Sequence, residues 1–335
     1  MKIEKKIKSL AILGENIRNI IENNEDIVNQ ASRRNPWFTP DFIHKALYGI
    51  TYMLKEEKLE KWISNYQLNN ENKRNIGIIM AGNIPLVGFH DLLSVLLSGN
   101  LAIIKLSHND DLLIPYIVNL LKAIDPAIGN RIFFRDSIDN AHAVIATGSD
   151  NTARYFQHTF KHLPFIIRKN RTSCCIIDGN EHEDDLRQLG DDIFSYFGLG
   201  CRNISKIYIP SDYKIHDLPP YFNAYNWITE HAKFNNNYRY LKSKYTLENK
   251  LFIDAGFFTL LEKEDLVSPI SCVYFESYDN PRDLGIILDK RKLKIQCIVS
   301  RDGWYPESIP FGKAQRPEPW EYADHVDTIN FLQSI

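Results

Sequence analysis

The fold is decided by the stretch NIGIIMAGNIPLVGFHDLLSVLLSGNLAIIKL, residues 75–106. Its two ends, 75–81 and 101–106, are short apolar runs rich in Ile, as buried strands are. Between them, residues 90–98 have the apolar density and length of a buried helix. Gly and Asn residues at the junctions are typical of turns. A strand, a helix and a strand in such short succession predict a parallel βαβ unit.

The same alternation continues along the chain, with a break near residue 165. Before the break, we expect a helix over 112–124, strands over 132–134 and 143–146, and a helix after Ser149. After it, we expect strands over 174–177, 206–209, 272–275 and 296–299, and helices over 182–197 and 280–288. The first series predicts a doubly wound parallel α/β sheet, and the second predicts a separate αβ unit. Residues 213–250, rich in Asn, Tyr and Lys, favour no single structure.

The segment before the first strand is predicted to be mostly helical. An apolar stripe at helical spacing is formed by Leu10, Leu13, Ile17, Ile20 and Ile21. Thr39-Pro40 is a helix-start signal. The Asn-rich residues 69–73 then indicate a linker.

Composition excludes several classes of function. At 335 residues, two domains are expected. Forty basic and 42 acidic residues give a formal charge of -2, which does not favour nucleic acid or an anionic membrane as a partner. We find no apolar run long enough to span a bilayer and no signal peptide at the charged start. Neither common glycine-rich phosphate loop is present, and no residues have metal-ligand spacing.

The five cysteines favour a reduced, cytoplasmic protein, because their number is odd and none form a Cys-x-x-Cys pair. Cys174 and Cys175 lie in an apolar run and are expected to pack within a strand. Cys201 is different, since it lies in YFGLGCRN, residues 196–203, between a predicted helix and a predicted strand. On spacing alone, a small buried residue at a tight turn is the commoner explanation. The other is a thiol presented to a carbonyl carbon.

A resemblance favours the second explanation. The stretch AGNIPLVGFHDLLSVLLSGN, residues 81–100, resembles the bacterial-luminescence type (LuxC-like) of fatty acyl-CoA reductase, within the aldehyde dehydrogenase superfamily. The similarity continues at Lys105, at 146–149, at 171–175 and at 197–203. It covers residues 75–210 well and the tail 309–332 adequately. The two motifs around Asn83 and Cys201 together make it specific.

The resemblance implies an aldehyde-dehydrogenase-like fold. Its expected parts are an N-terminal helical segment (1–70), a dinucleotide-binding domain (71–168), a catalytic αβ domain (169–305) and a return segment with an oligomerisation strand (306–335). Residues 326–332 alternate polar and apolar side chains, as an edge strand does. An unpaired edge strand is a liability. We therefore expect it to pair with a second copy in a dimer or larger homo-oligomer.

Catalytic roles follow from the resemblance. Cys201 takes the position of the superfamily's nucleophile, and Asn83 takes that of the Asn whose side-chain amide helps to form the oxyanion hole. A tetrahedral intermediate needs donors aimed at its oxygen, and the Asn83 amide and the Cys201 backbone N–H are two such donors. The alternative for Asn83 is an ordinary turn residue. The segment PFGK, 310–313, resembles the superfamily's Pro-Phe-Gly-Gly segment beside the active site.

Cofactor-binding roles also follow from it. Lys105 matches the lysine that contacts the adenosine ribose, although it is equally suited to ending a strand. Three residues later the superfamily often has a Glu, which repels a 2′-phosphate, but here the position is His108, with Ser107 beside it. This favours NADPH as cofactor, with NADH possible. Gly148 and Ser149 open a helix whose N–H groups suit a pyrophosphate, and Ser149 is also an ordinary N-cap.

One departure from the superfamily concerns the chemistry. Its hydrolytic members have a Glu that activates the deacylating water, whereas residues 166–171 here are IIRKNR, with no carboxylate. The chain therefore suits a reductase whose thioester survives until hydride arrives. Arg168, Lys169 and Arg171 are expected either in a solvated basic loop or at CoA or cofactor phosphates.

We therefore expect NADPH-dependent reduction of an acyl thioester, from acyl-CoA or an acyl carrier protein, to an aldehyde through S-acyl-Cys201. An acyl-activating enzyme is an expected partner. The alternatives are a non-reducing acyl-accepting protein and an aldehyde dehydrogenase running in the oxidative direction.

Overall fold

The computed structural model describes residues 2–23, 26–68 and 73–335. The chain forms two compact units, one of residues 1–170 with 316–335 and the other of residues 171–315. Each is described by itself below. Residues 69–72 of the predicted linker, which include the predicted boundary between helical segment and first sheet, lie outside the described residues.

The first unit contains a five-stranded sheet in the order β3-β2-β1-β4-β5. Its strands are β1 (Asn75–Ile79), β2 (Leu101–Lys105), β3 (Ile132–Phe134), β4 (Ala143–Thr147) and β5 (Phe165–Arg168). Every pair of neighbouring strands is parallel, which confirms the doubly wound sheet. The sequence pattern breaks at residue 165 and did not predict β5, which is the edge strand beside β4.

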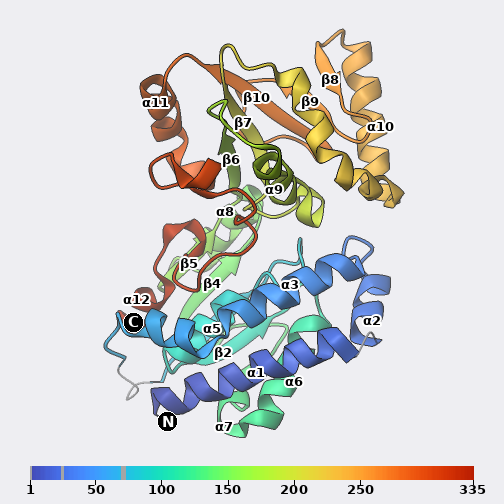
Figure 1. Ribbon diagram of the computed structural model, residues 1–335. Helices are drawn as coiled ribbons and strands as arrows, with labels where there is room; N and C mark the ends of the chain where they lie inside the picture. The colour runs from blue at the N-terminus through green and yellow to red at the C-terminus, as the bar shows by residue number, and fades with distance from the viewer. Residues whose placement is uncertain (1, 24–25, 69–72) are drawn as a thin grey trace. The chain divides into compact units, whose positions relative to one another are not determined.

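Helices cover this sheet. They are α1 (Ile3–Asn23), α2 (Asp26–Arg34), α3 (Pro40–Met53), α4 (Glu56–Ile63), α5 (Phe89–Leu97), α6 (Leu113–Ile124), α7 (Pro126–Gly129) and α8 (Asp150–Thr159). Thr39 caps α3 as predicted, since its side chain accepts from the Phe42 N–H. Figure 1 shows α1 beside α3, and the buried Leu10, Leu13 and Ile17 of α1 belong to the same core as β1 and β2. The N-terminal helices therefore complete the first sheet's core.

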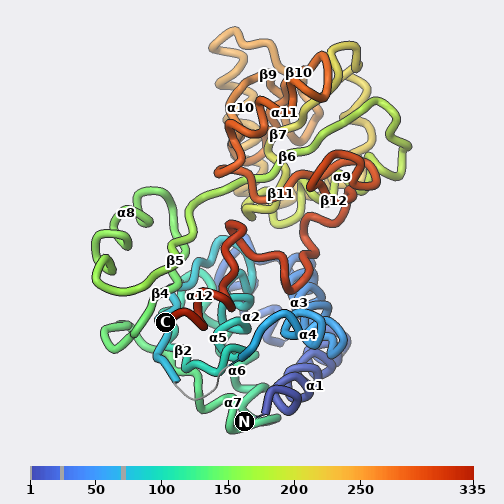
Figure 2. Tube along the Cα trace, turned by 90° about the vertical axis from the view of Figure 1, so that its left-hand side faces the viewer, coloured from blue at the N-terminus to red at the C-terminus, as the bar shows by residue number. Residues whose placement is uncertain are grey.

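The predicted C-terminal edge strand is wrong. Residues Thr328–Gln333 form a short helix, α12, which packs on α5 (Figures 1 and 2). The Asp327 carboxylate caps this helix by accepting from the Asn330 N–H at 2.9 Å. Ile329 and Leu332, three residues apart, are buried on one helical face. An assembly argument based on a free edge strand in this segment therefore no longer holds.

The second unit contains a seven-stranded sheet in the order β12-β11-β6-β7-β10-β9-β8. Its strands are β6 (Thr172–Ile176), β7 (Ile204–Pro210), β8 (Phe252–Asp254), β9 (Thr259–Glu262), β10 (Cys272–Tyr278), β11 (Ile295–Ser300) and β12 (Ile309–Pro310). Only the β8–β9 pair is antiparallel. Cys174 and Cys175 are fully buried in β6, so their predicted packing role is confirmed.

The remaining elements of this unit are helical. They are α9 (Glu183–Phe194), α10 (Ala232–Leu247) and α11 (Pro281–Arg291), with 3₁₀ segments η1 (Ser195–Gly198), η2 (Ile215–Asp217), η3 (Pro219–Glu230), η4 (Lys292–Lys294) and η5 (Arg301–Gly303). Residues 213–250, which had no clear prediction, are thus two 3₁₀ segments and α10. In the first unit, a further 3₁₀ segment, η6 (Ala323–His325), precedes α12. No helix within the described ranges is long and apolar enough to cross a membrane.

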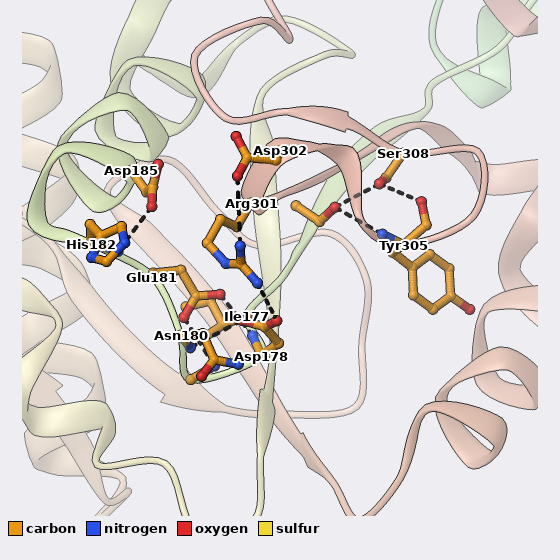
Figure 3. A network of polar contacts seen from close by, with 12 residues as sticks. Ile177, Asp178, Asn180, Glu181, His182, Asp185, Arg301, Asp302, Tyr305 and Ser308 are labelled. Atoms are coloured by element: carbon orange, nitrogen blue, oxygen red, sulfur yellow. Dashed lines mark hydrogen bonds and ion pairs between the residues drawn. The ribbon is translucent and has the colours of Figure 1, made fainter.

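A polar network joins the turn before α9 to the loop before β12 (Figure 3). Arg301 donates to the Asp178 carboxylate at 2.9 Å and lies 3.6 Å from that of Asp302. Glu181 accepts from the backbone N–H groups of Asp178 and Gly179. These contacts hold the start of α9, the helix that leads to Cys201.

Candidate active site

The first unit brings six predicted site residues to one edge of its sheet. Lys105 and Ala146 are the direct neighbours of Ile79 on its two sides, at the carboxyl ends of β2, β4 and β1. Asn83 follows β1, Ser107 and His108 follow β2, and Gly148 and Ser149 follow β4. Ligands of open parallel sheets bind outside the carboxyl ends of the strands, where the strand order reverses. Here that reversal lies between β1 and β4.

The turn that carries Asn83 lies against the loop that follows β2. Asn83 itself is exposed, whereas Gly82 is buried. A Cβ at Gly82 would lie 2.6 Å from the Ser107 Oγ and 2.9 Å from the Asn109 Cβ, so only glycine fits there. Ser107 also accepts from the Asn109 N–H at 3.2 Å. The residue before Asn83 is therefore packed directly on the proposed ribose loop.

A buried carboxylate makes a second link between these segments. The Asp110 Oδ2 accepts from the Leu86 N–H at 2.7 Å, and the buried Oδ1 has no hydrogen-bond partner among the described residues. The nearby backbone N–H of Leu113 also favours the ionised carboxylate. Leu86 has φ of 61°, a left-handed conformation that is costly for a residue other than glycine. Burial raises the pKa of Asp110 to about 6, although the two backbone N–H donors oppose that shift.

The positions predicted to bind the cofactor differ in exposure. Lys105 and His108 are exposed, and Ser107 is half-buried. The Ser149 side chain accepts from the Thr152 N–H, so Ser149 is the N-cap of α8, as the sequence predicts. A Cβ at Gly148 would lie 2.8 Å from the Thr152 side chain, so glycine lets β4 pass closely into α8.

Cys201 belongs to the second unit, in the turn between η1 and β7. It is half-buried. Ahead of it, Tyr196, Phe197 and Gly198 are consecutive left-handed residues, with φ of 52°, 57° and 77°. Such strain persists only where the surroundings impose it. Phe197 is held by ring contacts to His231 and Phe234, with centroids 4.3 and 5.7 Å apart.

Asn203 fixes the turn that contains the cysteine. Its side-chain amide donates to the backbone oxygens of Asp192, Ile193 and Ser195, at the end of α9 and the start of η1. Its carbonyl oxygen accepts from the Gly200 N–H at 2.8 Å. Because Asn203 is almost fully buried, one side chain sets the path from α9 to Cys201.

Ser173, from β6, supports the cysteine from the other side. Its hydroxyl donates to the Cys201 carbonyl at 3.0 Å and accepts from the Cys297 N–H at 3.1 Å. Its Oγ also lies 3.1 Å from the Cys297 Sγ. A hydroxyl has a single proton, so the Cys297 thiol is the donor in that contact.

The five cysteines differ in burial. It raises the pKa of Cys174, Cys175 and Cys272, which disfavours their thiolates. Cys201 and Cys297 are both half-buried. Since Cys297 lies within β11 and its thiol donates to Ser173, Cys201 is the cysteine best suited to act as a nucleophile.

The segment resembling Pro-Phe-Gly-Gly lies beside the Cys201 turn, within the second unit. The fully buried Asp192 carboxylate accepts from the Gly312 and Ala314 N–H groups at 2.7 and 2.9 Å. The Arg202 guanidinium donates to the Ala314 carbonyl. The residue that follows Cys201 is therefore tied to this segment.

The structure corrects the expectation for Arg168. The side chain is buried at the end of β5 and pairs with Asp91, with N–O distances of 2.6 and 3.2 Å. It also donates to the Ala323 carbonyl and the Thr328 hydroxyl. Arg168 is therefore neither in a solvated loop nor available to a phosphate, whereas Lys169 is exposed.

Sequence reasoning missed four supporting residues: Asp110, Ser173, Asp192 and Asn203. Ser173 and Asn203 lie inside the recognised motifs, so their polar side chains beside cysteines were a usable signal. Asp110 and Asp192 act on segments that are distant in the sequence, and no local pattern marks them.

The chain was compared with protein families and with curated proteins. A family model described as acyl-CoA reductase (LuxC) matches residues 4–218. A search of curated proteins found no match.

Similar solved structures are aldehyde dehydrogenases, and the three described next contain NAD⁺. A Pseudomonas syringae aldehyde dehydrogenase C mutant, complexed with NAD⁺ and octanal, has 10% identity and a TM-score of 0.65 over 90% of this chain and 73% of its own. The Bacillus cereus enzyme has 13% identity and a TM-score of 0.62, with 90% and 72% covered. The Mycobacterium tuberculosis enzyme has 12% identity and a TM-score of 0.62, with 90% and 73% covered. At such low identity these matches establish the fold, which is that of aldehyde dehydrogenases.

Proposed function

The chain belongs to the acyl-CoA reductase (LuxC) family, and on that premise we propose that it reduces an acyl thioester to an aldehyde with NADPH. The observation that carries the proposal is the extent of the family match, since residues 4–218 include both Asn83 and Cys201. The substrate is an acyl-CoA or the equivalent thioester of an acyl carrier protein.

Cys201 is the proposed nucleophile. Its thiolate attacks the acyl carbonyl carbon and forms a C–S bond, and the bond to the CoA sulfur then breaks, so CoA leaves as a thiolate that takes up a proton. The product is an S-acyl enzyme, and this covalent step divides one reaction into two easier ones. The fixed turn around Cys201, held by Ser173 and Asn203, supports this role because the nucleophile needs a defined direction.

Asn83 is the proposed oxyanion donor. The negative charge that develops on the carbonyl oxygen needs preorganised N–H groups, and the Asn83 side-chain amide and the Cys201 backbone N–H have the required chemistry. The exposure of Asn83, on a turn whose preceding glycine packs against Ser107, supports the proposal.

The carboxyl edge of the first sheet fits a dinucleotide. Gly82 and Gly148 let the turns after β1 and β4 pack closely on their neighbours, Lys105 is exposed at this edge, and the first turn of α8 offers backbone N–H groups to a pyrophosphate. When bound, the nicotinamide would supply the hydride that reduces the thioester carbon, after which the aldehyde leaves and the Cys201 thiolate is regenerated.

The charges near residue 108 favour NADPH over NADH. The position itself is a histidine, and the two nearby carboxylates are engaged elsewhere. Asp110 is buried against Leu86, and Asp111 forms an ion pair with Arg34. A 2′-phosphate at this position would therefore face Lys105 and His108 without a free carboxylate to repel it.

The end of β5 supports reduction over hydrolysis. The region where the resemblance puts the water-activating Glu of hydrolytic relatives, residues 166–171, has no carboxylate, and its Arg168 is buried in a pair with Asp91. An acyl-enzyme with no carboxylate base at that place is expected to survive until it is reduced.

A two-stage experiment tests the proposal. The purified chain is first incubated with radiolabelled acyl-CoA alone, and we expect one equivalent of CoA released and a label that hydroxylamine removes. Cys201→Ser should lose the label, while Cys297→Ser, the matched half-buried cysteine, should keep it. Added NADPH should then give aldehyde and NADP⁺ in equal amounts.

The other outcomes are equally definite. Label on Cys174, Cys175 or Cys297 in the wild type would refute the assignment of Cys201. Labelling without aldehyde on addition of NADPH would indicate an acyl-accepting protein. Consumption of aldehyde with NAD⁺ or NADP⁺, in the absence of CoA, would indicate an oxidising dehydrogenase.

A further inference from the structure

We propose that Asp110 is a positioning residue that fixes Asn83, and that it couples the oxyanion turn to the loop proposed to hold the adenosine ribose. The inference rests on the proposed function, because it assumes that Asn83 is the oxyanion donor. Asp110 touches no proposed substrate position. It acts on the backbone of the turn that carries Asn83.

The backbone of Leu86 is strained. Its left-handed conformation, with φ of 61°, costs about 1–2 kcal/mol for a residue with a Cβ. Because Leu86 is also buried, its backbone N–H needs a hydrogen-bond acceptor within the protein. The Asp110 carboxylate supplies the acceptor for the Leu86 N–H at 2.7 Å. That bond to an ionised group is of the strong class.

The turn of residues 82–86 is held at both ends. Gly82 packs against Ser107 and Asn109 so closely that a Cβ would not fit, and Leu86 is bonded to Asp110. Asn83 lies between these two points, one residue after the first and three before the second. Its backbone is therefore clamped, although its side chain is exposed.

Residues 107–110 both hold the turn that carries Asn83 and form the loop proposed to bind the adenosine ribose. Ser107, which packs against Gly82, and Asp110, which bonds Leu86, are three residues apart in one loop. The Asn35 amide, directly after α2, donates to the Asn109 carbonyl at 3.2 Å and holds the segment from that side. A shift of residues 107–110 on cofactor binding must therefore be passed to the turn at 82–86.

Asp111 provides a matched control, because it is adjacent, carries the same charge and faces elsewhere. Its carboxylate pairs with Arg34 on the surface, and its side chain is about one-fifth exposed. Asp111→Asn thus removes an equal charge from the same loop without touching Leu86. Asp110→Asn keeps the size of the side chain and one acceptor oxygen but removes the charge, so the Leu86 N–H is left with only a neutral, weaker hydrogen bond.

The experiment measures acylation by acyl-CoA in the absence of NADPH, so that cofactor affinity does not enter. We expect Asp110→Asn to acylate at least about 10-fold more slowly, within the 10²–10³-fold ceiling for losing one oxyanion donor. Asp111→Asn should match the wild type. In an Asn83→Ala background, Asp110→Asn should have no further effect, because both changes remove the same donor.

Two results would overturn the inference while leaving the proposed function intact. One is wild-type acylation by Asp110→Asn, and the other is a double variant slower than Asn83→Ala by the full single-variant factor. If Asp110→Asn does not fold, hydrogen exchange of the wild type decides: the Leu86 amide must be protected, and exchange at the rate of an unstructured amide refutes the clamp. Absence of acylation in the wild type, with Leu86 protected, would instead refute the proposed function.

Discussion

Replacing Arg168 with Met should destabilise the first unit by about 3–5 kcal/mol. Arg168 is 4% exposed and Asp91 is 7% exposed, so the substitution leaves a buried carboxylate without its cation. Removing one partner of a buried pair costs about that much. The bonds to the Ala323 carbonyl at 2.6 Å and the Thr328 hydroxyl at 2.9 Å are also lost, which frees the tail.

The size of this effect is large relative to the total. Single domains have free energies of unfolding of about 5–15 kcal/mol. For a domain of this size, each kcal/mol corresponds to about 2–4 °C, so the midpoint of thermal unfolding should fall by roughly 10 °C. Because the lost pair is confined to one unit, the transition of the other unit should keep its midpoint.

Urea unfolding, followed by hydrogen exchange in peptides of each unit, measures the effect. Arg187→Met is the matched control, since Arg187 makes exposed pairs with Glu183 and Asp184 on α9 and should change stability by less than about 1 kcal/mol. Arg168→Met with Asp91→Leu should recover part of the loss, because it removes the stranded charge. A loss below about 1 kcal/mol for Arg168→Met alone would refute the reasoning.

Three further outcomes are expected. Asn83→Ala should fold normally and lose about 10²–10³-fold in turnover, the usual cost of one oxyanion donor, and an unchanged rate would make Asn83 a turn residue only. NADPH should bind more tightly than NADH, and His108→Glu should narrow or reverse the difference, whereas equal wild-type dissociation constants by titration calorimetry would contradict the argument from residue 108. Burial raises the pKa of Asp110 from 3.8 to about 6, so the folded state holds a proton between those values that the unfolded chain releases, and this contribution to stability is lost as pH rises through about 6. Asparagine does not titrate, so between pH ~4 and ~7 the free energy of unfolding of Asp110→Asn should rise by about 3 kcal/mol relative to that of the wild type. A difference between the two proteins that stays constant with pH, measured by urea unfolding, would contradict this.

Regular strands and helices of the first sheet were predictable because their cause is local. The apolar runs that become β1 and β2 and the apolar helix between them are recognisable from their own residues, and parallel pairing follows because that helix crosses over from one strand to the next. The grouping of Asn83, Lys105 and Gly148 at one edge was likewise predictable in kind. Carboxyl ends of parallel strands meet there whatever their exact register.

The tail shows where local pattern fails. In DTINFL, residues 327–332, only the central Ile329-Asn330-Phe331 alternates, whereas Ile329 and Leu332 are spaced for one face of a helix. Asp327 decides between them, since its side chain caps the first turn of α12. A six-residue segment has too few positions for periodicity to separate the two structures, and the cap was the signal to weigh.

The role of Arg168 depended on contacts that no local pattern contains. Its partners Asp91 and Thr328 are 77 and 160 residues away in the chain. A run of three basic residues within four positions is usually solvated, and Lys169 is indeed exposed. Arg168 differs because it ends a strand whose side chains alternate between the two faces of the sheet, and Ile166, two residues earlier, is buried as Arg168 is.

The end of β5 has a structural need for a positively charged residue. A carboxylate at the end of β5 would lie near Asp91, and two like charges in a buried place repel each other. An arginine satisfies Asp91 and, through the Ala323 carbonyl and the Thr328 hydroxyl, anchors the tail to the first unit. Reversing the charge by Arg168→Glu is therefore not a route to a hydrolase. It should unfold the first unit before any acyl-enzyme can be attacked by water.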